Sequence, residues 1–228
     1  MRLIAVGDIH GEFDHLERLM VKLTPKEDDK IIFLGDYIDR GPKNPETVSF
    51  LLEFAKQFPN TVFLRGNHEQ MMLDSESRVS RNNSEDFMYH YLWVDNGGAA
   101  TINQYEKTNG LFEEHRPFFL STKLRHKEEF EGETYYFSHA GWDCFRGLET
   151  QYQKPNADYL LWEREHMSAL GRKLAEDNWT EGVAVFGHSP RKEPLNLPFM
   201  IGIDTGAVFG NYLTAVVLGK ERVFYTSE

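Results

Sequence analysis

The sequence has 228 residues, of which 40% are hydrophobic, so it can bury a full core and a single domain is the simplest expectation. Its formal net charge of −11 argues against a nucleic-acid groove or an anionic membrane surface as the main partner. The lone cysteine, Cys144, excludes an intrachain disulfide framework, suits a reducing compartment and is best interpreted as a small buried side chain. No apolar run resembles a secretory leader or is long enough to span a bilayer, so we expect a soluble, cytoplasmic protein.

The first third of the chain alternates strands and helices. Short aliphatic runs at Leu3–Val6, Ile31–Leu34 and Thr61–Leu64 predict three strands. Apolar residues at helical spacing predict a helix in each gap, the second with Asn44 as its N-cap and Pro45 as its first helical residue. This βαβαβ order predicts a parallel, mostly buried sheet with right-handed crossovers.

Residues from about 74 to 122 have a different composition, rich in charged and aromatic side chains. We expect helices near Asp86–Val94 and Ala99–Glu106, separated by a break at Asn96-Gly97-Gly98. This stretch therefore predicts a helical insertion over one side of the sheet.

Strands return in the second half of the chain. Lys127–Phe130 and Thr134–Phe137 flank Glu131-Gly132-Glu133, which predicts a hairpin. A second, more antiparallel sheet is expected to be completed by Val183–Phe186, Met200–Ile203, Leu213–Leu218 and Val223–Tyr225. We therefore expect the α/β class, as a two-sheet α/β sandwich with a helical insertion, formed by a single domain over residues 1–228.

Five short phrases place an Asp, Asn or His where a strand should end: Gly7-Asp8-Ile9-His10-Gly11, Gly35-Asp36-Tyr37-Ile38-Asp39-Arg40-Gly41, Gly66-Asn67-His68-Glu69, His139-Ala140-Gly141 and Gly187-His188-Ser189. In α/β proteins, functional groups gather at the carboxyl ends of strands, so ligands far apart in sequence converge. Two side chains at positions i and i+2 of an extended segment, such as Asp8 and His10, also point the same way. The pattern predicts a two-metal site.

The predicted ligands divide into two sets that share one carboxylate: Asp8, His10 and Asp36 for one ion, and Asp36, Asn67, His139 and His188 for the other. Oxygen and imidazole donors without thiolate favour Mn²⁺, with Fe or Zn²⁺ as alternatives. Taken singly, each of these residues is more often structural. Five histidines stand outside such phrases and are interpreted as structural: His15, His90, His115, His126 and His166.

Together the five phrases resemble the PPP family of Ser/Thr protein phosphatases, especially its small phage and bacterial subgroup, over nearly the whole chain. Three further phrases carry the resemblance: Asn96-Gly97-Gly98, Trp162-Glu163-Arg164-Glu165 and Ile203-Asp204-Thr205-Gly206-Ala207-Val208-Phe209. The resemblance implies the calcineurin-like metallophosphoesterase fold and the same metal ligands. It also implies that His68 is the general acid and that Asp39 orients and charges its imidazole.

Three arginines are predicted to bind the phosphate, because a guanidinium can hold two of its oxygens. Arg40 and Arg65 flank the metal phrases, and Arg164, expected on a helix after Tyr159, aligns with the family's third arginine. Asp204 is interpreted as a supporting or purely structural residue. Phe209 is interpreted as a wall of the pocket or as a core aromatic.

We interpret the chain as a metal-dependent phosphatase of phosphoserine and phosphothreonine monoesters, using a hydroxide that bridges the two ions. A dinucleoside-polyphosphate hydrolase acting on diadenosine tetraphosphate is the first alternative, although Asp39 and Glu69 favour the protein phosphatases. A metal-binding regulatory module without catalysis is the second, but it predicts a missing ligand or acid, and all are present. The sequence leaves the protein substrate, activity on phosphotyrosine, the metal and the oligomeric state open.

Overall fold

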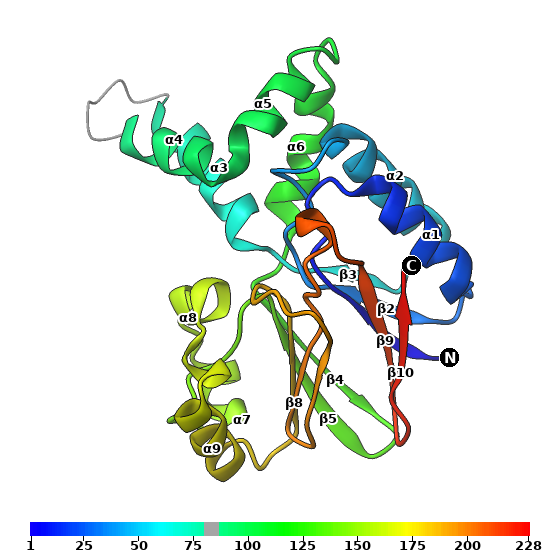
Figure 1. Cartoon of the computed structure of the whole chain (residues 1–228), viewed down its shortest axis with the longest axis vertical. Coiled ribbons are helices and arrows are strands. Elements are labelled where there is room, and N and C mark those ends of the chain that lie inside the picture. The colour runs from blue at the N-terminus through cyan, green and yellow to red at the C-terminus, as the bar shows by residue number, and fades with distance from the viewer. Residues whose placement is uncertain (80–86) are drawn as a thin grey trace.

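Two five-stranded sheets pack face to face in the computed structural model, which describes residues 1–79 and 87–228 (Figure 1). The first sheet has the order β10-β9-β1-β2-β3, with bounds β1 Leu3–Val6, β2 Lys30–Phe33, β3 Thr61–Phe63, β9 Thr214–Leu218 and β10 Val223–Thr226. The second has the order β4-β5-β6-β8-β7, with bounds β4 Arg125–Phe130, β5 Glu133–Ser138, β6 Val183–Phe186, β7 Leu195–Asn196 and β8 Met200–Gly202. The predicted α/β sandwich is confirmed.

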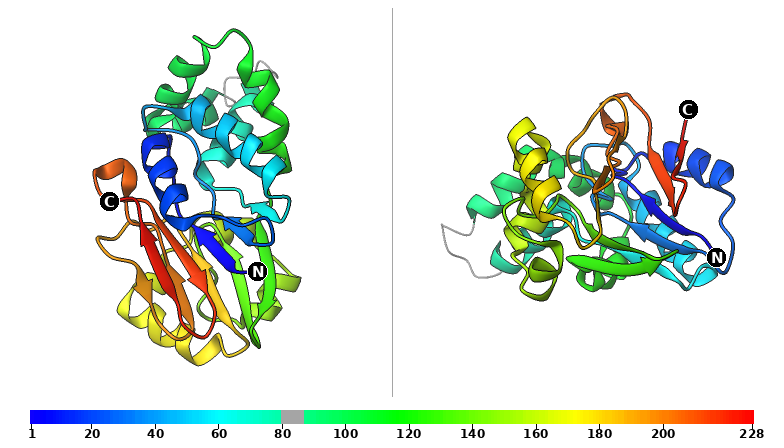
Figure 2. Two further views of the ribbon diagram at one scale, coloured as in Figure 1. Left: turned by 90° about the vertical axis from the view of Figure 1, so that its right-hand side faces the viewer. Right: turned by 90° about the horizontal axis from the view of Figure 1, so that it is seen from below.

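The core between the sheets comes from alternate residues of their strands. Ala5 and Ile32 of the first sheet and Phe137 and Val185 of the second are fully buried in one cluster. Helices cover the outer faces: α1 Phe13–Leu23 and α2 Asn44–Gln57 on the first sheet, and α7 Leu148–Gln153, α8 Ala157–Trp162 and α9 Ala169–Asn178 on the second. Seen from below, the strands lie between α1 on one side and α7 to α9 on the other (Figure 2).

The assignment of strands to sheets differs from the prediction at two points. β9 and β10 belong to the first sheet and not to the second, because β9 pairs antiparallel with β1 from Leu3–Leu218 to Val6–Ala215. The second sheet is also less antiparallel than expected, since β5 pairs parallel with β6 and β6 with β8. β1, β2 and β3 are parallel, as their order along the chain predicts.

The predicted helical insertion is present between β3 and β4. It contains α3 Asn67–Val79, α4 Phe87–Trp93, α5 Ala99–Tyr105 and α6 Leu111–Ser121. A wide turn at Val94–Gly98 separates α4 from α5, with Gly97 at φ 109°, as the glycine pair predicts. The start of α3 at Asn67 was not predicted. The predicted helix start at Asp86 lies outside the described residues.

Two local predictions had different outcomes. The hairpin is confirmed, with Glu131 and Gly132 at positive φ in a two-residue turn. The N-cap at Asn44 was wrong, because Asn44 lies inside α2 and Lys43 is the cap residue. The Asn44 amide instead donates to the carbonyl of Gly41. No helix among the described residues is long and apolar enough to cross a bilayer.

Candidate metal centre and active site

The carboxyl ends of β1, β2 and β3 meet those of β5 and β6 at one edge of the sandwich. A cavity of about 160 Å³ lies there. Its lining includes Asp8, His10, Asp36, Asn67, His68, His188, Arg40 and Arg164. A wider groove of about 500 Å³ lies beside the β4–β5 turn. Within the described residues, both groups of three side chains that could hold a metal ion are at the carboxyl-end edge: His10, Asp36 and His68 form one, and Asp36, His139 and His188 form the other.

One group of acceptor atoms surrounds a point between the two sheets. His139 Nε2 lies 2.9 Å from Asn67 Oδ1, 3.2 Å from His188 Nδ1 and 3.3 Å from Asp36 Oδ2. His139 Nδ1 lies 3.0 Å from the Leu34 carbonyl and donates to it, so Nε2 is the nitrogen that a metal would bind. Burial opposes the charged form of His139, but Asp36 outweighs it and raises the pKa, so a bound metal would displace a proton from Nε2. Burial lowers the pKa of His188 to about 2, so its imidazole is neutral. Oxygens and lone pairs this close are compatible when a cation lies among them, so this set fits a divalent metal.

A second group of acceptors shares Asp36. His10 Nδ1 donates to the Ile38 carbonyl at 2.8 Å, and His10 Nε2 lies 3.3 Å from Asp36 Oδ2. Asp8 Oδ2 accepts the His188 backbone N–H at 2.9 Å, whereas Asp8 Oδ1 is buried and has no hydrogen-bond partner in the described part of the chain. An orphaned buried carboxylate oxygen is costly, and a cation would satisfy it.

The two aspartates respond to this crowding in opposite ways. Burial, followed by the charges of Asp204 and Asp36, holds the pKa of Asp8 well above its usual range. Burial also opposes ionisation of Asp36, but the neighbouring histidines, led by His139, hold its pKa well below its usual range. A divalent cation between these two carboxylates would stabilise the charged form of both.

The backbone at this edge is strained. Within residues 1–79 and 87–228, eight non-glycine residues have positive φ, and five of them belong to the predicted site: His10, Asp36, Asp39, Arg40 and His188. The chain at His10 is therefore turned. The sequence argument for the direction of the His10 side chain had assumed an extended segment, and this assumption was wrong. Gly66 and Gly187 allow close approach as well as turning, since a Cβ would lie 2.0 Å from Asp36 Oδ1 and Asp8 Oδ1, respectively.

Glu69 has a positioning role that the sequence argument missed. Its Oε2 accepts the N–H groups of Asp36 and Gly66, each at 2.9 Å, and its Oε1 accepts that of Tyr37 at 2.8 Å. The carboxylate thus fixes the loop that carries the shared ligand to the start of α3. Burial and Asp36 raise the pKa of Glu69 to about 7. An acidic residue three positions after Gly66, reaching back to its N–H as in a capping box, was the available signal.

His68 lies on the cavity wall and contacts Asp39. Its Nδ1 lies 2.7 Å from Asp39 Oδ2, and both side chains are buried. Burial lowers the pKa of His68, while Asp36 and Asp39 act in the opposite direction. Nδ1 donates to Asp39, which directs Nε2 away from the carboxylate.

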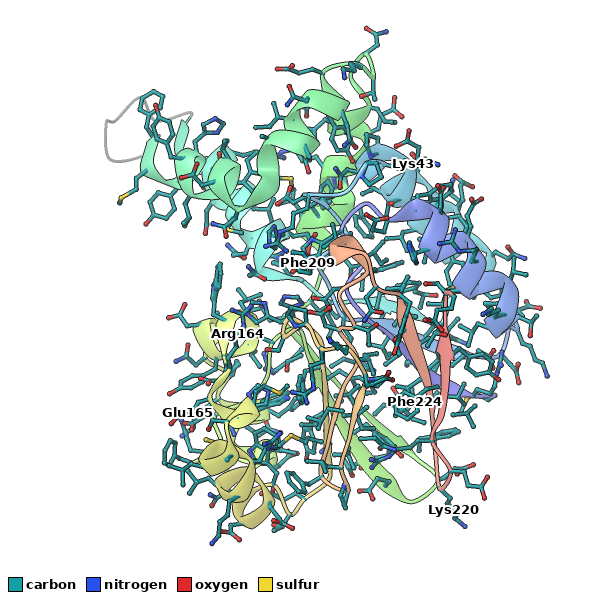
Figure 3. All side chains as sticks on the ribbon, in the orientation of Figure 1. Lys43, Arg164, Glu165, Phe209, Lys220 and Phe224 are labelled. Atoms are coloured by element: carbon teal, nitrogen blue, oxygen red, sulfur yellow. The ribbon has the colours of Figure 1, made fainter. Side chains whose placement is uncertain are left out.

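Two of the three predicted arginines, Arg40 and Arg164, line the cavity, and Arg65 does not. Arg40 lines the cavity, with NH1 2.8 Å from His10 Nε2 and its guanidinium 5.6 Å from the centre of the Phe209 ring. Arg164 also lines the cavity and donates to the His188 carbonyl at 3.0 Å. The prediction that Arg164 lies on a helix was wrong, because α8 ends at Trp162. Figure 3 shows Arg164 and Phe209 near each other at this edge, reaching it from different elements.

Arg65 does not reach the cavity. Its guanidinium contacts the end of α6 and the residues that follow, donating to Thr122 Oγ1 at 3.0 Å and to the Leu120 carbonyl at 3.3 Å. It also donates to Gln70 at 3.0 Å. With these groups occupied, Arg65 ties α6 to α3, and we leave it out of the phosphate clamp.

Comparisons with known proteins agree with this geometry. A family model described as calcineurin-like phosphoesterase matches residues 1–208. The chain belongs to that family. This phosphoesterase is 32% identical to serine/threonine-protein phosphatase 1 of Salmonella typhimurium over 219 residues, covering 92% of this chain and 88% of that protein. The predicted resemblance to the PPP family is thereby confirmed.

Two further relatives define what is common and what varies. The phosphoesterase is 25% identical over 240 residues to bis(5'-nucleosyl)-tetraphosphatase PrpE of Bacillus thuringiensis, covering 95% and 90% of the two chains. A solved protein serine/threonine phosphatase from Saccharomyces cerevisiae, with similarity to human phosphatase PP5, superposes with a TM-score of 0.66 at 16% identity, covering 99% and 79%. The fold and the hydrolase class are therefore shared, whereas the substrates named for these relatives differ.

The remaining predicted residues of the phosphoesterase lie as follows. Asp204 lines the cavity, and its Oδ1 accepts the Gly206 N–H at 2.9 Å. Phe209 is 65% exposed at the cavity rim, so it is a wall residue and not a core aromatic. Cys144 is buried, as expected. The described residues that line the cavity do not include any of the five histidines interpreted as structural.

His166 is the most unusual of those five histidines, because neither nitrogen of its fully buried ring has a hydrogen-bond partner within residues 1–79 and 87–228. Burial lowers its pKa from 6.5 to about 3. Below pH 6.5 the unfolded chain binds a proton that the folded chain excludes, so stability is lost as the pH falls from about 6.5 toward 3.

We therefore expect His166→Leu to flatten the acid side of the stability profile. The wild-type free energy of unfolding should lose about 2 kcal/mol more than the variant's between pH 6.5 and about pH 5. Urea unfolding of both proteins across that range measures the difference. Equal slopes would contradict the buried, neutral state of this imidazole.

Proposed function

We propose that this phosphoesterase is a metal-dependent phosphoprotein phosphatase that hydrolyses phosphoserine and phosphothreonine monoesters. The observation that carries the proposal is the His68–Asp39 pair at 2.7 Å, next to His and Asp side chains that could hold metal ions, with His68, Arg40 and Arg164 lining one small cavity. A cavity of about 160 Å³ accommodates a phosphoryl group and the start of one side chain. The Salmonella relative supports this substrate class.

Each group of the site has a task in this reaction. The residues that would hold two divalent cations are Asp8, His10, Asp36, Asn67, His139 and His188, and their oxygen and imidazole donors favour Mn²⁺. When bound, such ions supply Lewis acidity toward the phosphoryl oxygens and toward water. Arg40 and Arg164 bind the remaining phosphoryl oxygens, with guanidinium groups that suit paired acceptors.

His68 supplies the proton that the departing serine or threonine oxygen needs. Protonated at both nitrogens, its Nδ1–H stays on Asp39 while Nε2–H faces the cavity, where the leaving oxygen accepts it. Asp39 keeps the ring in that orientation and stabilises its positive charge. An alkoxide is a poor leaving group, so this transfer matters most for the proposed substrates.

Diadenosine tetraphosphate remains the alternative substrate, because a relative with 25% identity is named a bis(5'-nucleosyl)-tetraphosphatase, the class of enzyme that would act on such a molecule. The cavity could take one phosphate of that molecule, with the adenosines outside against the exposed rings of Trp162 and Phe209.

A side-by-side assay tests the proposal. Protein reloaded with Mn²⁺ is offered a phosphoserine peptide, a phosphotyrosine peptide and diadenosine tetraphosphate, and kcat/KM is compared. We expect the phosphoserine peptide to be the best substrate. A clear preference for diadenosine tetraphosphate would overturn the proposal, and no turnover of any of them would favour a non-catalytic metal-binding module.

Arg164→Ala is expected to raise KM and lower kcat together, because the guanidinium should bind phosphate in both the ground state and the transition state. Steady-state kinetics with a phosphoserine peptide measure both constants. Arg65→Ala is the matched control, since that guanidinium points away from the cavity, and its KM should stay near the wild-type value. Unchanged kinetics for Arg164→Ala would remove it from the clamp.

A further inference from the structure

Asp39 is held by more hydrogen bonds than the interaction with His68 requires. Its carboxylate is fully buried. Oδ2 accepts from His68 Nδ1 at 2.7 Å and from Trp93 Nε1 at 2.8 Å, and Oδ1 accepts from Thr101 Oγ1 at 2.5 Å. The same hydroxyl accepts the backbone N–H of Asp39 at 3.0 Å. Both oxygens are therefore fixed, and the plane of the carboxylate cannot turn.

Both additional donors belong to the helical insertion. Trp93 ends α4 and Thr101 is in the first turn of α5, on either side of the Asn96-Gly97-Gly98 break. A Cβ on Gly98 would lie 2.6 Å from the Trp93 indole, and one on Gly97 would lie 2.6 Å from Arg40 Cγ. The Gly97 carbonyl also accepts the Arg40 N–H at 3.2 Å. The absence of a Cβ at Gly97 therefore lets the backbone of the insertion pack closely against Arg40, and its absence at Gly98 leaves room for the Trp93 indole.

We propose that Trp93 and Thr101 are positioning residues for proton transfer, acting through Asp39 on His68. A buried carboxylate held by a single donor can rotate about its Cβ–Cγ bond. The His68 imidazole, which is hydrogen-bonded to Asp39, would then rotate as well, and Nε2 would no longer point at the leaving oxygen. Donors on both oxygens prevent this rotation and offset the cost of burying the charge. The inference rests on the proposed function, because only a reaction with a poor leaving group needs this proton.

The test removes each donor with little change of shape. Trp93→Phe deletes the indole N–H and Thr101→Val deletes the hydroxyl, while Thr101→Ser keeps the hydroxyl. Trp142→Phe is the control for Trp93→Phe, because Trp142 is also buried but its indole N–H has no hydrogen-bond partner among the residues that the structure describes. For each variant, kcat and KM are measured on a phosphoserine peptide and on nitrophenyl phosphate, together with metal content.

We expect Trp93→Phe and Thr101→Val each to lower kcat on the peptide by about 10- to 100-fold, the usual effect of losing an outer hydrogen-bond partner. KM and metal content should stay near wild type. The loss on nitrophenyl phosphate should be several-fold smaller, since its phenol leaves more easily. Thr101→Ser should recover most of the activity, and Trp142→Phe should affect both substrates alike.

A double-mutant cycle gives the decisive result. On an Asp39→Ala background, Trp93→Phe should cause no further loss specific to the peptide, because its route to His68 is gone. Equal losses on both substrates, or a full additional loss on that background, would overturn the proposal and leave the two residues structural. Either donor variant alone decides the question if the other does not fold.

Failure of this inference can be told apart from failure of the proposed function. If His68→Asn shows the leaving-group effect and the Trp93 and Thr101 variants do not, only the inference fails. If the wild-type protein does not hydrolyse the phosphoserine peptide, or if His68→Asn affects both substrates equally, the proposed function or its acid assignment fails.

Discussion

We expect His68→Asn to lower turnover of phosphoserine esters by about 10²–10⁴-fold, the usual contribution of positioned proton transfer, while both metal ions stay bound. The ring lies on the cavity wall and contacts Asp39, and it is not among the six proposed ligands. Asparagine can keep a hydrogen bond to Asp39 but cannot release a proton to the substrate. Kinetics on a phosphoserine peptide, with metal content measured on the same sample, test this prediction.

The leaving group provides the internal control for this variant. Nitrophenyl phosphate releases a phenol, which needs an acid less than an alkoxide does, so its turnover should fall clearly less. Asp39→Asn should show the same pattern more weakly, because it disturbs the orientation of His68 but keeps the imidazole. Equal losses on both substrates with full metal would indicate that His68 binds phosphate, and loss of a metal ion would indicate that it is a ligand.

The second large effect is expected at Asp36. Its Oδ2 lies 3.3 Å from His10 Nε2 and 3.3 Å from His139 Nε2, so one oxygen faces both groups of ligands. Asp36→Asn should therefore reduce the metal content toward zero and abolish activity, because a carboxylate shared by two ions supports both sites. Asp8→Asn should lose about half of the metal, since Asp8 belongs to one group. Metal analysis after dialysis distinguishes these results.

Asp204→Asn is the matched control for this pair. Asp204 lines the same cavity and has the same side chain, but it is not one of the six proposed ligands. We expect it to keep both ions. Full and equal occupancy in the Asp36 and Asp8 variants would contradict the division of ligands, and a complete loss in the Asp204 variant would mean that total charge decides binding.

Local patterns predicted most of the elements, because helical and strand periodicities are properties of neighbouring residues. Pairing between distant segments has no such signal. The apolar run of β9 fits any sheet, and its place beside β1 depends on which edge the first three strands leave open. The start of α3 at Asn67 was missed for a different reason. Polar residues directly after a strand also fit a loop, so the first turn of this helix was interpreted as the end of β3.

The site was accessible to prediction as far as its chemistry is written in residue types. Asp, Asn and His at strand ends indicated a metal centre, and the cavity brings most of those side chains together. The residues that position the catalytic side chains are not recognisable from their residue types alone. Trp93 and Thr101 look like ordinary aromatic and polar residues of a helix, and Arg65 resembles Arg40 until the direction of its side chain is known.

The pairing of β9 with β1 delays completion of the first sheet during synthesis. A ribosome makes β1 before its neighbour β9, and most of the described residues lie between Leu3 and its partner Leu218. The His188 N–H that binds Asp8 is also made long after β1, so a nascent chain has no complete centre until β6 and the residues that follow it have been made. Contacts this distant in sequence make folding slow, and the unfinished sheet offers an open edge that other chains could join. Chaperone dependence and losses to aggregation should therefore arise before β9 is released, and they should fall once it is.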